Sequence, residues 1–205
     1  MFPVAELSFF KRFCHFSRAR RYLFSFAVLL LAFTGSHAAM QRVHSDTAAI
    51  VSTLKPLTRL SATKQLRLAI SLPLRNQQAL TDFLRQLQDP SSPNYRKYLT
   101  PAQFAGRFGP TEQDYQAVIA FANTHGLTVT ARHSNRMVLD VASAVSDIEK
   151  AFHVTMRTYQ HPREPRQFYA ASAEPTLDLP VPILGIAGLD NYSIPRPMVK
   201  FMVRS

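Results

Sequence analysis

The stretch Asp89–Val129, DPSSPNYRKYLTPAQFAGRFGPTEQDYQAVIAFANTHGLTV, combines a turn, two helix starts and a helix stop. Its first six residues favour a turn, because proline fixes φ and Asp, Ser and Asn side chains bond their own backbone. Thr100 and Thr111 each precede a Gln or Asp by three residues, a pattern that satisfies the free amides at a helix start. The first helix should end at Gly109-Pro110. Gly126 should end the second, because glycine readily adopts a positive φ.

Apolar residues alternate with polar or small ones just ahead of this stretch. Leu66, Leu68 and Ile70 have the two-residue period of a strand with one buried face. Asn76 is placed to cap the helix that follows. The apolar stripe of that helix comprises Leu80, Phe83, Leu84 and Leu87. We therefore expect a core strand and an amphipathic helix before the turn.

Further elements are predicted after the central stretch. Residues 127–141 have the pattern of a hairpin with a tight turn at 133–135. Ser143 is expected to cap a short helix that ends at Phe152, and residues 154–158 to form another strand. The order is strand, helices, hairpin, helix and strand. It suits an α+β fold in which an antiparallel sheet carries helices on one face, in a split β-α-β arrangement.

The two ends of the exported chain carry weaker signals. Residues 39–64 are polar and their apolar residues recur at no fixed period, so we expect an irregular leader that is partly ordered at best. The prolines between residues 176 and 183 argue against a regular element there. The prolines at 195 and 197 favour an extended linker.

The first 38 residues have the pattern of a signal peptide. Five basic residues precede an apolar run at 22–33, and Ser36-His37-Ala38 is a small-x-small cleavage site, so we expect cleavage between Ala38 and Ala39. A run of twelve residues is too short for a stable membrane anchor, which needs about twenty. An arginine pair ahead of the run leaves the twin-arginine route open. We expect a secreted or periplasmic protein.

The charge of the chain points to a protein partner. The formal net charge is +11, and removing residues 1–38 takes away five basic residues and one acidic residue, which leaves +7. No run of five basic residues and no basic-aromatic string of the RNA-binding type occurs, so we expect no nucleic-acid partner. An acidic protein fits better. Cys14 is the only cysteine and lies in the expected signal peptide, so the exported chain would hold no disulfide.

The sequence lacks the motifs of catalytic, cofactor and metal sites. Six glycines form no phosphate-binding loop, and no two of the seven histidines have the H-x-x-x-H spacing of a zinc site. His125, His133 and Asp140 could be combined with a serine on paper, but no serine lies in a G-x-S-x-G elbow. Asp140, near Arg136, is instead expected to form a solvated or cross-strand ion pair. We therefore assign no catalytic, cofactor-binding or metal-binding residue.

Several segments occur together in the order known from one family. They are Asp89-Pro90-x-Ser92-Pro93-x-Tyr95-x-Lys97-Tyr98-Leu99-Thr100-Pro101, Phe108-Gly109-Pro110, His125-Gly126-Leu127, Glu149-Lys150-Ala151-Phe152, Phe168-Tyr169-Ala170, Leu179-Pro180 and Ile186-Ala187-Gly188-Leu189-Asp190-Asn191. This set resembles the activation prodomain of the sedolisin, or kumamolisin-like, serine-carboxyl peptidases. It covers roughly Leu66–Asn191. One departure is Arg96, which stands where relatives often have glycine.

The resemblance divides the chain and implies a fold. Together with the signal, leader and linker patterns described above, it divides the chain into a signal peptide at 1–38, a leader at 39–64, the prodomain at 65–191 and a linker or truncated tail at 192–205. The implied fold is the ferredoxin-like sandwich, in agreement with the pattern of elements. The family's catalytic module has a Ser-Glu-Asp triad and a calcium site, and neither is found in this sequence. We therefore expect no enzyme in this chain by itself, and no calcium outside the missing catalytic domain.

The implied function is that of an exported propeptide of a sedolisin-type serine endopeptidase. It would act as intramolecular chaperone and as an inhibitor released in acid. The partner would be the catalytic domain, in cis as in the family or in trans here. Candidate interface residues are Tyr95, Tyr98, Arg132, Arg136 and Arg157. Candidates for a tail in the substrate cleft are Asp190, Asn191, Tyr192, Pro195 and Arg196.

Two alternatives remain open at the level of sequence. The chain could be a free-standing secreted inhibitor or binding protein for an acidic partner. It could also be a truncated, non-functional peptidase remnant, with Met198–Ser205 as an out-of-frame tail. A functional prodomain normally continues into its protease, and this sequence stops after Ser205.

Overall fold

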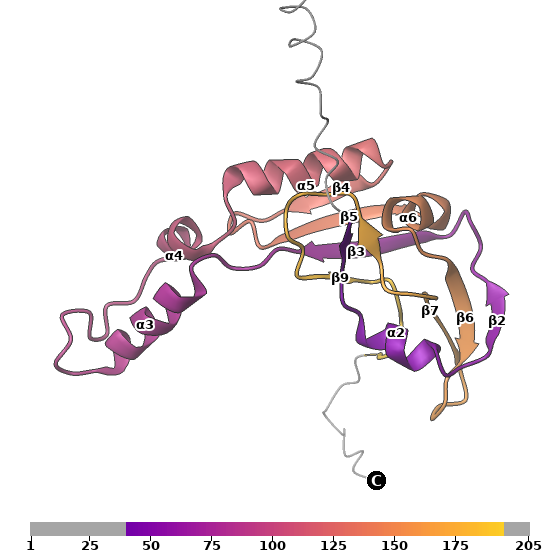
Figure 1. Cartoon of the computed structure of the whole chain (residues 1–205), viewed down its shortest axis with the longest axis horizontal. Helices are drawn as coiled ribbons and strands as arrows, with labels where there is room; N and C mark the ends of the chain where they lie inside the picture. The colour runs from indigo at the N-terminus through magenta and orange to yellow at the C-terminus, as the bar shows by residue number, and fades with distance from the viewer. Residues whose placement is uncertain (1–39, 195–205) are drawn as a thin grey trace, which may run out of the picture. The chain divides into compact units, whose positions relative to one another are not determined.

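The computed structural model describes residues 40–194 (Figure 1). The helices are α2 (Asp46–Val51), α3 (Gln77–Gln88), α4 (Pro101–Phe108), α5 (Glu112–Thr124) and α6 (Val145–Phe152). The strands are β1 (Gln41–Arg42), β2 (Pro56–Arg59), β3 (Gln65–Ser71), β4 (Thr128–Arg132), β5 (Val138–Ala144), β6 (Met156–Gln160), β7 (Gln167–Ala171), β8 (Thr176–Leu177) and β9 (Gly185–Ala187). None of the helices among these residues is long and apolar enough to cross a membrane.

The main sheet has the strand order β4-β5-β3-β9, and every neighbouring pair is antiparallel. Strand β5 therefore lies between β3 and β4, which run in the same direction and are joined through α3, α4 and α5. This is the split β-α-β arrangement. Helix α6 follows β5, and β9 closes the other edge beside β3. The predicted α+β fold, a ferredoxin-like sandwich with an antiparallel sheet and helices on one face, is confirmed.

Helices α5 and α6 pack on the same face of this sheet (Figure 1). The register places Leu68 beside Val141 and Ile70 beside Leu139, and all four side chains are buried. The helices bring Val118, Ala122, Ile148 and Phe152 into the same cluster. Burying a side chain of this size stabilises the fold by about 1.5–3 kcal/mol relative to leaving it in water.

The predicted helix starts and stop are confirmed at the level of hydrogen bonds. The Thr100 and Thr111 hydroxyls accept bonds from the amides three residues later, and Gln103 and Asp114 bond back to complete two capping boxes. After α5, Gly126 has φ +74°, the left-handed conformation that ends a helix without a steric penalty for glycine. Its neighbour Leu127 donates to the carbonyl of Ala122 at 2.9 Å.

Two predicted capping details were wrong. Asn76 precedes α3, but its backbone is left-handed with φ +52° and its amide donates to the carbonyl of Arg107 at 3.3 Å instead of capping the helix. Ser143 lies inside β5, because pairing with β3 continues as far as Ala144. Its hydroxyl donates to the carbonyl of Gly126 at 3.0 Å, and Ala144 occupies the N-cap of α6.

The expectation of an irregular leader at 39–64 was wrong for most of that range. Strand β1 pairs with β8, helix α2 follows, and β2 pairs with β6. Val43, Val51 and Leu60 are buried. Val43 directly follows β1, Val51 ends α2 and Leu60 directly follows β2. The segments that these elements contact lie more than about 90 residues away in the sequence, so no local period marks the three residues. Strand β8 is likewise a short element within the proline-rich segment 176–183.

A second antiparallel sheet has the order β2-β6-β7. Val51, Tyr159, Phe168 and Ala170 form a small core there, with Leu54 and Tyr192 packed against it. The chain reaches this sheet again after β9 through Gly188, which has φ +94°. A side chain at Gly188 would overlap the carbonyl oxygen of Arg67, so the close approach of this turn to β3 requires glycine.

Candidate functional site

The face of the main sheet opposite α5 and α6 is made mostly of small side chains. The strand registers place on it Arg67, Ala69, Ser71, Ala131, Val138, Asp140, Ala142 and Ala187, which we call the open face. Ala69 lies beside both Asp140 and Ala187. When one face of an antiparallel sheet is exposed to water, its strands usually place polar side chains on that face and apolar side chains on the buried face. Four alanines and a valine are unusual for that role, and they make the surface flat.

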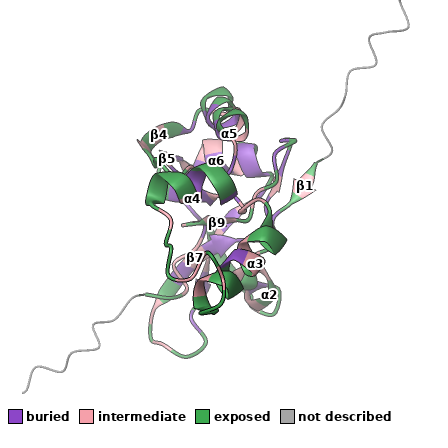
Figure 2. Ribbon diagram, turned by 90° about the vertical axis from the view of Figure 1, so that its left-hand side faces the viewer, coloured by how far each residue is buried: buried purple, intermediate pink, exposed green. Residues whose placement is uncertain are grey.

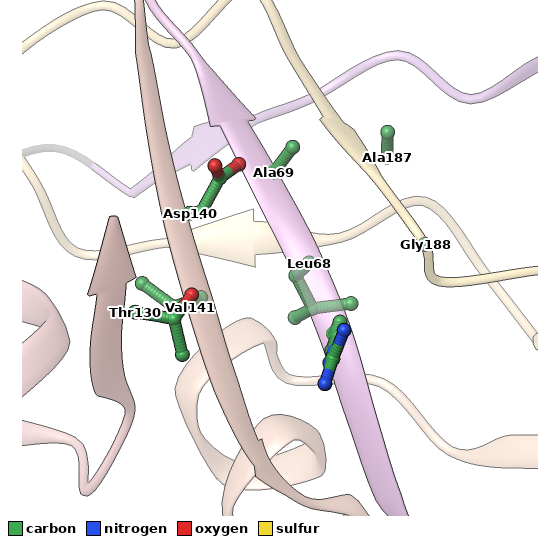
Figure 3. Close-up of a pocket in the computed structure, with 8 residues that line it drawn as sticks. Leu68, Ala69, Thr130, Asp140, Val141, Ala187 and Gly188 are labelled. Atoms are coloured by element: carbon green, nitrogen blue, oxygen red, sulfur yellow. The ribbon is translucent and has the colours of Figure 1, made fainter. Parts of the chain in front are cut away.

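An open depression of about 500 Å³ lies along this face. Arg67, Ala69, Thr130, Asp140 and Ala187 are among its lining residues. Figure 3 shows the side chains of Ala69 and Asp140 on neighbouring strands, pointing to the same side. The lining offers one guanidinium, one carboxylate and one hydroxyl. These groups can orient a partner, and nothing in the lining supplies an activated nucleophile.

The side chain that Asp140 contacts is His133 and not Arg136, so the contact is an ion pair only when His133 is protonated. The His133 Nε2 lies 3.0 Å from an oxygen of Asp140, at the hairpin end of the open face. Arg136 has φ +58° and donates to the carbonyls of Pro110, at 2.8 Å, and Ala105, at 3.3 Å. Arg136 therefore joins the β4–β5 turn to the junction of α4 and α5.

The five predicted interface residues do not share one element. Tyr95 and Tyr98 lie in the loop between α3 and α4, where Tyr98 is 76% exposed. Arg132 ends β4 and Arg136 lies in the hairpin turn. Arg157 lies on β6 of the second sheet, opposite Arg59 in the register of β2 and β6. No hydrogen bond or ion pair joins any two of the five in the described part of the chain. Of this set, Arg132 and Tyr98 are the exposed side chains.

The loop that holds the two tyrosines has the turn chemistry expected from its sequence. Asp89 accepts hydrogen bonds from the amide and hydroxyl of Ser91, at 2.9 and 2.7 Å. Arg96 has φ +55°, a conformation that glycine adopts at lower cost, and its guanidinium lies over the ring of Tyr95. Glycine, which the resemblance leads us to expect at this position, would adopt this conformation without a steric penalty.

The C-terminal segment Asp190–Tyr192 is bound to the domain. Asp190 accepts a hydrogen bond from Thr47 at 2.8 Å, and the amide of Asn191 donates to the carbonyl of Tyr169 at 3.1 Å. The Asn191 side chain in turn accepts from the amide of Tyr169 at 2.6 Å. Arg166 donates to the carbonyls of both Asn191 and Tyr192.

The contacts of Asp190–Tyr192 affect the pKa of Tyr169 and show where part of the predicted tail lies. Burial raises the pKa of the Tyr169 phenol, and the nearby charge of Asp190 raises it further. Three of the five residues predicted for a cleft-occupying tail are thus held on β7. The remaining two, Pro195 and Arg196, lie outside the described residues, as do the expected cleavage residues Ala38 and Ala39.

Metal-ligating side chains do not gather anywhere in residues 40–194. No group of three or more His, Cys, Asp or Glu side chains there could hold a metal ion. The histidines have other partners: His125 contacts the carbonyl of Phe121, and His153 that of Thr176.

The chain was then compared with known proteins. The family model for the pro-kumamolisin activation domain matches residues 52–192. Sedolisin from Pseudomonas sp. (strain 101) is 27% identical over 181 residues, which are 85% of this chain and 31% of that protein. Xanthomonalisin from Xanthomonas sp. (strain T-22) is 30% identical over 140 residues, 67% of this chain and 17% of that protein. Kumamolisin from Bacillus sp. (strain MN-32) is 25% identical over 142 residues, 68% and 25% of the two chains.

The chain thus spans about a third or less of the length of these relatives. The matched region is the activation domain of serine-carboxyl peptidases and not their catalytic domain. The match begins at residue 52, inside the segment expected to be a leader, which agrees with the folded elements found there. The chain belongs to the pro-kumamolisin activation domain family.

Proposed function

We propose that this chain is the exported propeptide of a sedolisin-type serine endopeptidase, in which it acts as intramolecular chaperone and as an inhibitor released in acid. The observation that carries the proposal is the open face, a flat surface of small side chains on a sheet whose other face is fully packed. Such a face can approach a second protein surface closely and form a further packed layer. Export to the periplasm or the medium through the N-terminal segment is part of the same proposal.

The partner is the catalytic domain that the relatives carry in the remaining part of their chains. In cis it would be joined to the segment after Tyr192, and in trans it would be a separate chain. Docking on the open face would place Arg67, Asp140 and Thr130 against polar groups of the peptidase, with the alanines forming the close contact. The exposed Arg132 and Tyr98 remain candidate contacts outside this face.

Charge supports release in acid. The exported chain is basic, so it would attract carboxylates on the peptidase at neutral pH. Those carboxylates become protonated as the pH falls, while histidines on the propeptide gain charge. The attraction then weakens in the pH range in which an acid peptidase would be needed.

The test is inhibition of a purified sedolisin-type peptidase by the chain from Ala39 onward, titrated at neutral and at acid pH. Ala69→Arg places a long side chain in the middle of the open face, where Asp140 on the neighbouring strand can pair with it and keep the sheet intact. Ala120→Arg is the matched control, because Ala120 is exposed on α5 on the other side of the sheet. Circular dichroism would establish that all three chains are folded.

The proposal predicts inhibition by the unchanged chain and by Ala120→Arg at neutral pH, weaker inhibition in acid, and an inhibition constant at least about tenfold larger for Ala69→Arg. Equal inhibition by both variants would mean that the open face is not the docking surface. A folded chain that inhibits no sedolisin-type peptidase at either pH would overturn the proposed function.

A further inference from the structure

The C-terminal anchor, Asp190–Tyr192, is held by a site that the docking surface does not include. The anchor forms a bridge with β7, where Ala170 pairs with Asp190. Arg166, in the loop between β6 and β7, donates hydrogen bonds to the carbonyls of Asn191 and Tyr192. The ring of Tyr192 stacks on His161 at a centroid distance of 4.6 Å and meets the edge of Phe168 at 5.1 Å. Tyr192 is therefore the last side chain that this site holds.

His161 is one of only two polar or charged side chains buried in the described part of the chain, at 7% exposure. It stacks on Tyr192 and also meets Phe168 edge-on at 5.8 Å. Its Nδ1 accepts a hydrogen bond from the amide of Arg163 at 3.2 Å. Because a backbone amide can only donate, the neutral ring must carry its proton on Nε2. A second proton would have to go on Nδ1 and would break this bond.

The charges around His161 are already committed to other partners. Arg163 and Arg166 come from the same loop, and Arg166 pairs with Glu164 at 2.5 Å. Asp190, on the anchor, accepts from Thr47 of α2 and from the amide of Tyr192. The other neighbours are the phenols of Tyr192 and Tyr159 and the apolar side chains of Phe168, Val51 and Leu54. A positive imidazolium here would lie against the aromatic rings of Tyr192 and Phe168, beside the anchor carbonyls that Arg166 already binds.

We propose that His161 is a pH-sensitive latch on the C-terminal anchor. The neutral ring accepts from Arg163 and stacks on Tyr192, so the anchor stays bound to β7. Protonation turns the acceptor into a donor that opposes the Arg163 amide, and it places a charge against the ring stack. The loop between β6 and β7 then shifts, and the grip of Arg166 on the anchor carbonyls is lost with it.

The latch would determine where the propeptide becomes available to a protease. With the anchor bound, Tyr192 is held to the domain; with the anchor released, the last residue held before it is Leu189, whose side chain is buried in the main core. This consequence rests on the proposed function, because it matters only if the segment after the anchor enters or leaves a substrate cleft. The latch itself is a property of this chain alone.

The test measures the latch without any peptidase. Amide exchange protection of Asn191 and Tyr169, whose amides form the hydrogen bonds between the anchor and β7, would be followed by NMR from about pH 7.5 to about pH 5, together with the ring signals of His161. The expected result is a loss of protection of about tenfold, the equivalent of one hydrogen bond, with the same midpoint as the His161 titration. Protection that stays constant while His161 becomes protonated would overturn the proposal.

Two variants sharpen the result. His161→Phe keeps the ring stack on Tyr192 and cannot titrate, so protection of the anchor should no longer depend on pH. His133→Phe removes a different histidine, which pairs with Asp140, and should leave the acid loss at the anchor unchanged. An acid loss in His161→Phe equal to that of the unchanged chain would also overturn the latch. Because no peptidase is used, these outcomes are independent of whether the chain inhibits one.

Discussion

The main sheet with α5 and α6 differs from the α3–α4 segment, residues 77–108, in how far the apolar stripes of its helices are buried. Both regions have apolar stripes at helical spacing. Helix α5 buries Tyr115, Val118, Ile119, Phe121 and Ala122. Helix α3 buries Phe83 alone, and Leu84 in the same stripe is 50% exposed. An amphipathic pattern thus predicts a helix, but it does not tell whether the same chain supplies the surface that covers the stripe.

The few contacts of the α3–α4 segment are mainly aromatic. Phe83 meets Phe108 of α4 at 6.3 Å between ring centroids, and Arg107 lies over both rings. Figure 2 shows helix α4 mostly in green, the colour of exposed residues, although Ala105 and Phe108 are buried. The main sheet is stabilised by long-range burial, whereas the α3–α4 segment depends on local caps, this ring contact and hydrogen bonds to the carbonyls of α4 from Arg75, Asn76 and Arg136. Three pairs of substitutions test this difference.

The largest effect is expected from truncation of the two stripes. Ile119→Ala in α5 should lower the free energy of unfolding by about 2–5 kcal/mol, because it leaves a cavity in the core. Leu84→Ala in α3 should change it by less than about 0.5 kcal/mol, because the side chain is half exposed already. Denaturant unfolding of both variants measures the difference.

Similar losses for the two variants would contradict this view. A cost above about 1 kcal/mol for Leu84→Ala would mean that the α3 stripe is covered in the folded chain in solution. A small cost for Ile119→Ala would mean that the packing of α5 on the sheet contributes little to stability.

The caps provide the second comparison, because each region has one capping box. Thr111→Ala should lower the free energy of global unfolding by about 1 kcal/mol, since α5 is packed on the sheet and must unfold with it. Thr100→Ala removes an equivalent cap from α4. It should mainly speed amide exchange within α4 and cost less than half as much globally. Equal global costs would show that α4 unfolds together with the sheet.

What could be predicted from the sequence was whatever local chemistry determines. The capping boxes, the Gly126 stop and the alternation of Leu66, Leu68 and Ile70 each depend on residues within a few positions, and the structure confirmed them. The leader could not be predicted, because Val43 and Leu60 are buried by strands far along the chain. Ser143 was misassigned because a serine just before a helix has the sequence pattern of an N-cap, whether or not the preceding strand continues through it.

The candidate site followed the same rule. Sequence reasoning chose exposed-looking arginines and tyrosines, yet Arg136 is used within the fold. It missed the open face, because alanines on a strand carry no chemical signal until the strand register brings them together. It missed His161 as well, although a histidine at the end of one strand and an aromatic residue on the next could have suggested an edge-on ring contact. Only the fold shows that Tyr192 completes that site.

The smallest effect concerns two carboxylates with lowered pKa values, one in each region. Burial alone would raise the pKa of Glu149, but hydrogen bonds from Arg59, at 2.5 Å, and from the amide of Met156, at 2.7 Å, outweigh it and hold the pKa below the usual value. Because the folded pKa is depressed, Glu149 stabilises the fold at neutral pH. This stabilisation is lost as the pH falls from the usual glutamate range near 4.5 through the lower folded value.

Glu149→Gln should therefore be less stable than the unchanged chain at pH 7, by less than the Thr111 cap contributes, and the difference should vanish in strong acid.

Asp89 is the matched control in the α3–α4 segment, because its pKa is lowered by the hydroxyl and amide of Ser91, two residues away in an exposed turn. Asp89→Asn should leave the pH dependence of global unfolding unchanged, since its bonds close only a local loop, whereas Glu149 joins α6 to β2 and β6. Denaturant unfolding of the three chains from pH 7 to pH 3 separates the cases. A change in acid stability for Asp89→Asn as large as for Glu149→Gln would mean that the α3–α4 segment unfolds together with the sheet, and the contrast between the two regions would then be wrong.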